Sequence, residues 1–320
     1  MKKYTLEELI QFANDPNPRI RIKAARNPRT PAEILEKLAE DITDTDIISC
    51  ICSNISTPIS VLEKLFNYTD LDLKPYIYTN FHFLIAGSPN LTDEMRNRLL
   101  KADTSNIKCI LAGNNKTPVH ILEKFAEDED WNVRNSVAEN SNTPVHILEK
   151  LFEEKEENYT YLIKRSIACN PNVPVHILEK IAENEEYLGY PFDFWRNKKL
   201  PASFIEKLFE KRKLEHYDWY EMARHINTPV YILGVFAKIG NDSVHSGLAR
   251  NRKVPARILE ILSDSEVMTI RRNVAANPRT GIRTLRKLTN DKYAVVRKKA
   301  VKRLAKKQVN EKRKMQNWLI

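Results

Sequence analysis

Glycine and cysteine are scarce in this 320-residue chain, and long apolar runs are missing from it. Only 7 glycines are present while 42% of the residues are apolar, a composition that argues against disorder and favours a folded, helix-rich protein. No uncharged stretch approaches the roughly 20 residues that a membrane helix needs, and the opening MKKYTLEELIQF has no signal-peptide core. We therefore expect a cytoplasmic protein that does not enter a membrane.

The few cysteines do not form the common disulfide or metal patterns. They contain no CxxC pair, and they stand at Cys50, Cys52, Cys109 and Cys169. Reduced thiols that are buried or half-buried are expected from this spacing. We expect no cofactor, metal ion or iron–sulfur cluster.

Acidic residues become rare toward the carboxyl end. Residues 266–320 hold 17 Lys and Arg against 3 acids, a net charge of +14, so the total of +10 leaves residues 1–265 at −4. A basic block of this kind attracts polyanions or an acidic protein surface.

A unit of 26–34 residues recurs along the chain, which is typical of repeat proteins. We take the proline of its Thr-Pro pair as position zero. Apolar residues at +3, +4 and +7 predict a downstream helix, and those at −11, −7 and −6 predict an upstream helix. Proline fills eight of the ten zero positions, which are Pro31, Pro58, Thr92, Pro118, Pro144, Pro174, Pro201, Pro229, Pro255 and Gly281.

The turn between the two helices carries recurrent polar side chains. Threonine at −1 is expected to cap the downstream helix, with proline as the first helical residue. Thr30 with Glu33, and Thr5 with Glu8, are expected to form capping boxes. Asparagine at −4 is expected to be structural, with a left-handed backbone and an amide that bonds the turn. The −4 asparagines are Asn27, Asn54, Asn114, Asn140, Asn170, Asn197, Asn251 and Asn277.

A single two-helix unit cannot bury its own apolar face, so the units must stack. We predict an all-α, right-handed superhelical α-solenoid of about ten two-helix repeats over residues 1–304. Capping helices are expected at about 5–14 and from about 292, with repeats to about 290 and a basic tail at 305–320. Insertions at 67–80 and 183–197 interrupt the spacing.

Histidine recurs at +2 in TPVHILEK and its near-copy, as His120, His146 and His176. A rotation of 100° per residue places +2 opposite the apolar face, so these side chains are expected to be exposed. Equivalent residues of stacked repeats are about 9 Å apart, whereas zinc holds its nitrogens at about 2.1 Å. The three histidines are therefore not expected to share a metal ion.

The wording ANPRTPAEILEKLAED, with VRNSVAENSNTPVHILEKL and IRRNVAANPRT, resembles the leucine-rich repeat variant (LRV) family and more distantly the HEAT-like solenoids. The resemblance covers roughly residues 5–304 and implies an α-solenoid. Some members of the first family carry an N-terminal iron–sulfur module, but no cysteine precedes Cys50 here. HEAT-like solenoids use an Asp/Arg ladder between repeats, and we interpret the cations at −10 in this way: Arg21, Lys108, Arg134, Lys164, Arg271 and Arg297.

The same resemblance implies that the upstream helices line a concave groove, with positions −9 and −5 facing it. From the sixth repeat onward these positions and one neighbour form a basic and aromatic strip: Arg165, Phe192, Arg196, Trp219, Tyr220, Arg224, Arg250 and Arg272. A basic C-terminal patch follows at Arg297, Lys298, Lys299, Lys302 and Arg303. Guanidinium groups bind carboxylates and phosphates, and aromatic faces stack on bases or on proline-rich peptide. The structural alternative is a set of degenerate repeats whose side chains only cover the core.

Two functions fit this surface. The first is a non-enzymatic scaffold that binds a protein or peptide partner, acidic in character, along the groove and the basic end. The second is a nucleic-acid-binding protein that uses the same strip.

Catalysis is not expected from the sequence. HEAT-like DNA glycosylases imply an aspartate four residues after a tryptophan, but the residues at that spacing here are Asn135, Lys199 and Ala223. The sequence also has no HExxH motif, no phosphate-binding glycine loop and no evident nucleophile with a base.

Overall fold

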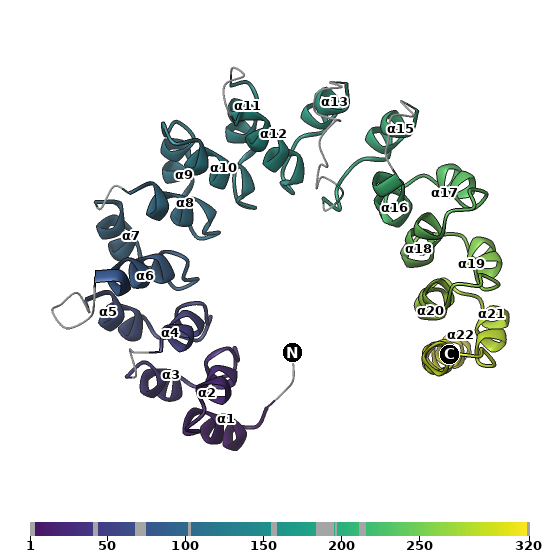
Figure 1. Ribbon diagram of the computed structural model, residues 1–320, viewed down its shortest axis with the longest axis horizontal. Coiled ribbons are helices and arrows are strands. Elements are labelled where there is room, and N and C mark those ends of the chain that lie inside the picture. Colours follow the sequence, from purple (N-terminus) through teal and green to yellow (C-terminus); the bar gives the residue numbers. More distant parts are fainter. Residues whose placement is uncertain are drawn as a thin grey trace. The chain divides into compact units, whose positions relative to one another are not determined.

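The computed structural model describes residues 4–40, 44–67, 75–101, 104–154, 159–183, 195, 197–210 and 216–318. All regular structure in these ranges is helical, which confirms the all-α prediction. The chain divides into unit 1, Met1–Val173, and unit 2, Pro174–Ile320, where one solenoid over 1–304 was expected. Each unit is a stack of helical repeats (Figure 1).

Unit 1 contains twelve helices in the described residues. They are α1 Leu6–Ala13, α2 Pro18–Ala25, α3 Ala32–Leu38, α4 Thr45–Cys52, α5 Ile59–Asn67, α6 Pro75–Ala86, α7 Asp93–Leu100, α8 Ser105–Gly113, α9 Val119–Phe125, α10 Trp131–Glu139, α11 Val145–Phe152 and α12 Thr160–Cys169.

Unit 2 contains nine helices in its described part. They are α13 Val175–Glu183, α15 Ala202–Glu210, α16 His216–Arg224, α17 Val230–Phe236, α18 Asp242–Arg250, α19 Ala256–Leu262, α20 Met268–Ala276, α21 Ile282–Leu288 and α22 Ala294–Trp318. Among the described residues, no helix is both long enough and apolar enough to cross a membrane.

The helices of each unit form two rows, one of upstream and one of downstream helices (Figure 1). Successive upstream helices pack directly on one another: α8 contacts α10, α16 contacts α18, and α18 contacts α20. The fully buried alanines at −6, such as Ala138 and Ala249, make this close approach possible. The apolar residues at +4 of the downstream helices, such as Leu122 and Leu259, are also fully buried. The predicted helical faces are therefore the ones that form the core.

The polar turn residues act differently from the prediction in one respect. The downstream helix begins after the proline, at Ala32 in the first repeat, so Pro31 occupies the N-cap position and makes no side-chain cap. The Thr30 hydroxyl donates instead to the carbonyl of Ala24 at 2.6 Å, at the end of α2. Threonine therefore satisfies the carboxyl end of the upstream helix, and the predicted Thr30–Glu33 capping box is wrong. The box between Thr5 and Glu8 is present.

The same threonine bond recurs through both units. In each case the hydroxyl at −1 donates to the carbonyl at −7, within one repeat. The further donors are Thr57, Thr117, Thr143, Thr228 and Thr280.

The asparagine at −4 connects each repeat to the one before it. The amide of Asn140 donates to the carbonyl of Ala112 at 2.6 Å and to that of Asn114 at 3.0 Å. Its side-chain oxygen accepts the backbone N–H of Asn142 at 2.9 Å. The backbone at Asn140 is extended, with φ −66° and ψ 121°, and not left-handed as predicted. The asparagine is structural, but its main bonds lie between repeats and not within its own turn.

We call this set of bonds the asparagine ladder. Each amide donates to the −6 and −4 carbonyls of the preceding repeat, at distances between 2.6 and 3.0 Å. The −6 carbonyl belongs to the last helical turn, whose oxygens have no partner within the helix, and the −4 carbonyl follows the end of the helix. The members that make both bonds are Asn54, Asn114, Asn140, Asn170, Asn251 and Asn277.

Two positions deviate from the ladder. Ser88 takes the −4 place in the third repeat, and nearby Asn90 donates to the previous repeat at Ile55 and Thr57 instead. His225 takes the −4 place in the eighth repeat, where its Nε2 lies 3.0 Å from the carbonyl oxygen of Asn197. The link between repeats is therefore preserved by other donors.

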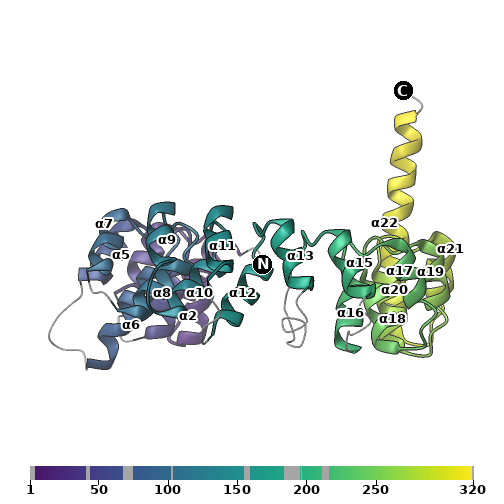
Figure 2. The same ribbon diagram turned by 90° about the horizontal axis from the view of Figure 1, so that it is seen from above.

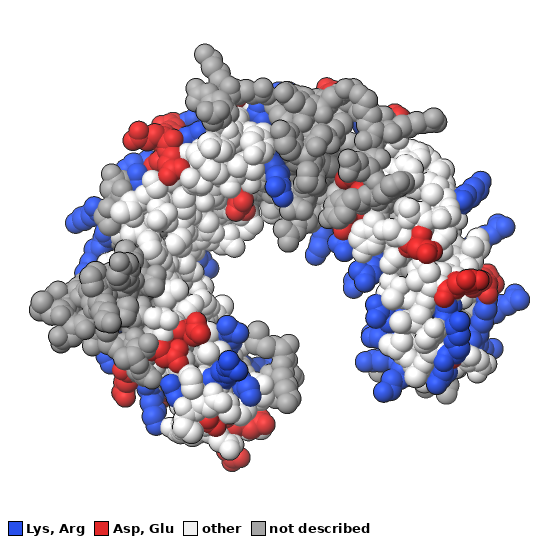
Figure 3. Space-filling model, viewed as in Figure 1, with Lys and Arg blue, Asp and Glu red and all other residues white. Residues whose placement is uncertain are grey.

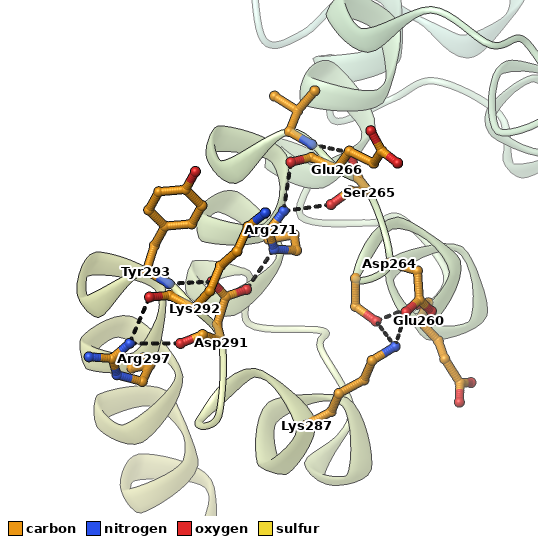
Figure 4. A network of polar contacts seen from close by, with 12 residues as sticks. Glu260, Asp264, Ser265, Glu266, Arg271, Lys287, Asp291, Lys292, Tyr293 and Arg297 are labelled. Atoms are coloured by element: carbon orange, nitrogen blue, oxygen red, sulfur yellow. Dashed lines mark hydrogen bonds and ion pairs between the residues drawn. The ribbon is translucent and has the colours of Figure 1, made fainter.

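Cations at −10 form a second connection, as the predicted ladder required. Arg271 binds Asp291 of the next repeat at 2.6 Å and donates to the carbonyl of Ser265 at 2.6 Å (Figure 4). Arg134 pairs with Glu154 at 3.1 Å. The Arg271 guanidinium lowers the pKa of Asp291. The remaining pairs are Arg21 with Asp44 and Lys108 with Asp128.

The last helix differs from the expected short cap followed by a tail. Helix α22 runs from Ala294 to Trp318 and so includes 305–318 as helix. Figure 2 shows it extending past the other helices of unit 2. Val296 and Ala300 of this helix are fully buried, and α22 contacts α20 and α21.

The asparagine ladder predicts a large effect of one substitution. Asn140→Ala removes the donor of the Ala112 carbonyl and one of the two donors of the Asn114 carbonyl, which should lower the free energy of unfolding by about 1–3 kcal/mol. Urea unfolding followed by circular dichroism measures this as a lower midpoint. Asn115→Ala is the control, since Asn115 is exposed and its side chain only accepts a bond from Ser141. Equal midpoints for the two variants would contradict the ladder.

Candidate functional site

The predicted strip falls on both units. Arg165 lies half-buried on α12 of unit 1, whereas the other described members belong to unit 2. Phe192 and Arg196 lie outside the described residues. The site is therefore built from unit 2 alone, where Lys and Arg side chains gather along the edge formed by α16, α18, α20 and α22 (Figure 3).

Two exposed arginines stand at equivalent positions of neighbouring repeats. Arg224 ends α16 and Arg250 ends α18, so each lies at the negative end of a helix dipole. Nη1 of Arg250 donates to the hydroxyl of Tyr220 at 3.0 Å. The guanidinium of Arg224 lies 5.8 Å from the Tyr220 ring centre and 3.3 Å from a carboxylate oxygen of Glu221. Tyr220 thus holds both arginines at one edge.

Gly247 allows this arrangement because it lets α18 approach α16. A Cβ atom at this position would lie 2.5 Å from the carbonyl oxygen of Tyr220, closer than real side-chain atoms come. Glycine is therefore required beneath the Tyr220–Arg250 pair, a constraint the sequence alone did not indicate.

The tryptophans near the strip make their contacts inside unit 2. The indole of Trp219 lies 6.2 Å from the ring of Phe236, a fully buried residue. The indole N–H of Trp195 donates to Asp218 at 3.0 Å, and only 5% of this residue is exposed. The expected aromatic stacking surface is thus reduced, among the described residues, to Tyr220 on α16.

Two hollows open between the carboxyl ends of the upstream helices. Hollow A, about 550 Å³, is lined by Lys198, Glu221, Arg224, His225, Arg250 and Arg252 among others. Hollow B, about 450 Å³, is lined by Arg250, Arg252, Asn273, Arg303 and Lys306 together with small side chains. Because Arg250 and Arg252 line both, the two hollows adjoin. We call them together the basic edge.

Arg252 was missed by the sequence analysis. It is at position −3, in the turn after α18, and only the helical columns −9 and −5 were considered for the groove. Lys198 is the corresponding −3 residue of an earlier repeat in unit 2 and lines hollow A. Only these two of the ten −3 residues are basic, so the column as a whole gave no signal that could have identified them.

The remaining predicted basic residues do not share one face. Arg303 turns toward α20 and donates to the carbonyl of Ala276, beside hollow B. Arg297 donates to the carbonyls of Asp291 and Lys292 at 2.8 and 3.0 Å. A different hollow is lined by Arg297, Lys298 and Lys302, together with the exposed Val301. Lys299 is exposed, and Arg272 on α20 is half-buried and lines neither hollow A nor hollow B.

His225 has a defined protonation state at the base of hollow A. Its Nε2–H donates to the carbonyl of Asn197, and its Nδ1 accepts the backbone N–H of Asn227 at 3.3 Å. A proton on Nδ1 would point at that N–H group, so protonation would break this hydrogen bond. Burial is the main cause that lowers the pKa of His225, and the nearby Arg224 and Lys253 lower it further. The folded chain therefore holds a neutral imidazole here.

The other residues considered as ligands have plain roles. His120, His146 and His176 are exposed, as predicted, and His146 lies 3.1 Å from Glu123. The four cysteines are free thiols, buried or half-buried as predicted, and burial raises the pKa of Cys52 to about 12. No group of three or more His, Cys, Asp or Glu in the described part of the chain is arranged to hold a metal ion.

Comparisons with known proteins give structural neighbours only. No protein-family model and no curated protein matches the chain. A structure described as a leucine-rich repeat variant with a novel repetitive motif matches with a TM-score of 0.31 and 14% identity, covering 91% of this chain and 88% of that one. An engineered protein matches with a TM-score of 0.28 and 15% identity, covering 95% of this chain and 98% of that one. A designed armadillo repeat protein matches with a TM-score of 0.15 and 13% identity, covering 94% of this chain and 99% of that one.

These neighbours include the type of repeat that the sequence resembles. At such low TM-scores the superpositions carry no further inference about this chain. The helical-repeat fold rests on the chain's own helices and on the contacts between successive repeats.

The neutral state of His225 predicts a pH-dependent stability. Folding lowers the pKa of His225. As the pH falls below about 6.5, the imidazole is therefore protonated in the unfolded chain before it is protonated in the folded chain. This contribution is complete above that pH and is lost as the pH falls. His225→Asn restores the usual ladder residue and removes the titration, so its stability should fall less than that of the wild type between pH 7.5 and 5.5. Parallel unfolding midpoints across this range would contradict the assignment.

Proposed function

We propose that this protein is a non-enzymatic repeat scaffold that binds an acidic protein or peptide partner along the basic edge of unit 2. The α-helical repeat fold is suited to binding because stacked units present long, regular surfaces. The observation that carries the choice of partner is the lining of the two hollows. Six cations lie around them, from Lys198 to Lys306, and Glu221 is the one acid among the lining residues.

The side chains of Lys198 and Arg252 have no hydrogen-bond or ion-pair partner among the described residues, and both residues lie at exposed turns. Arg250 bonds a neutral hydroxyl and so keeps its full charge. Carboxylates of a partner would supply the missing acceptors, and arginine pairs with them in a bidentate manner.

The same surface supports a non-enzymatic role. The ionisable groups of the basic edge are mostly cations that stay charged at neutral pH, and His225 is held by two backbone groups. Neither arrangement offers a base beside a nucleophile.

Nucleic acid is the alternative that the basic edge must be tested against. A phosphate backbone would also meet the cations, and its binding would weaken linearly with the logarithm of salt concentration. The aromatic contribution expected for single strands is small here, since Trp195 and Trp219 pack inside unit 2. This favours the acidic protein partner.

Affinity capture from native lysate tests the proposal when nuclease is added. The wild type should retain a protein partner after nuclease treatment. The double variant Arg224→Glu with Arg250→Glu should lose most of it, by tenfold or more, since each change replaces an attraction with a repulsion. Quantitative mass spectrometry of the captured proteins measures the loss.

The matched control is Arg283→Glu with Arg286→Glu, which makes the same charge change at exposed positions of α21 away from the hollows. This control should retain the partner. If the Arg224 and Arg250 variant captures as much as the wild type, the basic edge is not the binding surface. If nuclease abolishes capture, the partner is a nucleic acid.

A further inference from the structure

Hollow B differs from the rest of the chain in its unbalanced charge. Four cations line it, Arg250, Arg252, Arg303 and Lys306, and no carboxylate is among its lining residues. Helix α18 supplies Arg250, the turn after it supplies Arg252, and helix α22 supplies the other two. The site is therefore assembled only when the last repeats are stacked.

Cations elsewhere in the described chain commonly have a carboxylate partner when they are partly buried. Arg271 pairs with Asp291, and Arg134 pairs with Glu154. Arg252 and Lys306 are exposed, and their side chains have no hydrogen-bond or ion-pair partner in the described residues. Mutual repulsion of four cations is unfavourable unless an anion joins them.

Two of the four cations are already held in place by neutral oxygens. Arg303 donates to the carbonyl of Ala276, and Arg250 donates to the Tyr220 hydroxyl at 3.0 Å. A guanidinium carries five N–H donors, so each keeps several for a ligand. Because these two guanidinium groups are already held in place, a ligand that binds them causes a smaller loss of side-chain entropy.

We propose that hollow B accepts the phosphate group of a phosphorylated serine or threonine within the acidic segment that the basic edge binds. The inference rests on the proposed function and specifies its ligand. A phosphoserine carries a charge of about −1.5 to −2 and three acceptor oxygens, so it matches four cations better than a single carboxylate does. Clusters of arginine are a common means of recognising such groups.

The neighbouring hollow A favours a peptide over a nucleic acid as the source of the phosphate. Glu221 lines it, with 13% of its side chain exposed, and pairs with Arg224. A continuous phosphate backbone that ran from hollow B into hollow A would meet this carboxylate. A peptide with one phosphate and a few acidic side chains need not place a negative charge beside Glu221.

Fluorescence anisotropy with three labelled peptide pools tests the proposal on the full-length chain. Each pool has 15 residues with flanks drawn from Asp, Glu, Ser and Gly, and the central residue is serine, glutamate or phosphoserine. The phosphoserine pool should bind about tenfold more tightly than the glutamate pool, as one or two added charge-assisted bonds allow. A labelled 15-nucleotide single-stranded DNA is the fourth probe.

Arg252→Glu with Lys306→Glu should remove the phosphoserine preference while the glutamate pool loses less affinity. Arg283→Glu with Arg286→Glu makes the same charge change outside hollow B and should keep the preference. Equal binding of the phosphoserine and glutamate pools would overturn the phosphate site and leave the acidic-partner proposal standing. Absence of binding by every peptide pool would overturn both, as would DNA binding more tightly than the phosphoserine pool.

Discussion

The structure depends on one hydrogen-bonded connection, the amide of a buried asparagine that spans two repeats. In Asn251 this amide reaches the carbonyls of Ala223 and His225 while its oxygen receives the N–H of Lys253. Three backbone groups are thereby bonded by a single side chain that is fully buried. Helices of eight or nine residues can end inside the protein because such partners are supplied to their last carbonyls.

This connection also explains the shortage of glycine. Helices often end on a glycine with a left-handed backbone, which frees the last carbonyls to bond the following N–H groups. Among the described glycines none has a positive φ, because threonine and asparagine side chains bond those carbonyls instead. A consequence is that the turns stay extended and lie in register, so that equivalent residues of successive repeats form columns. The basic edge is such a set of columns, with Arg224 and Arg250 one repeat apart.

Much of this could be predicted from the sequence. The period, the two helices of each repeat, the exposed histidines and the structural role of asparagine all follow from patterns within one repeat. The partner of each asparagine could not be found in this way, because it lies about 26 to 32 residues earlier and no local pattern encodes that distance. The prediction for threonine failed because two helix ends compete for its hydroxyl, and the buried carbonyl at −7 has no other side-chain donor.

The candidate site was predicted less completely than the fold. Arg224, Arg250 and Tyr220 were found because they lie on helical columns, and they do lie together. Arg252 was missed because it lies in a turn, and Trp219 faces the core side because it occupies the −10 position where other repeats carry a cation. Arg303 lies at a different hollow from Arg297 and Lys298, and this separation depends on how α22 packs, which the sequence does not specify.

Hydrogen exchange of asparagine side-chain amides, measured by nuclear magnetic resonance, tests the central claim most directly. If the ladder holds the repeats, the amide protons of Asn140, Asn251 and Asn277 should exchange far more slowly than those of the exposed Asn290. Exchange of all four at the same rate would contradict the account.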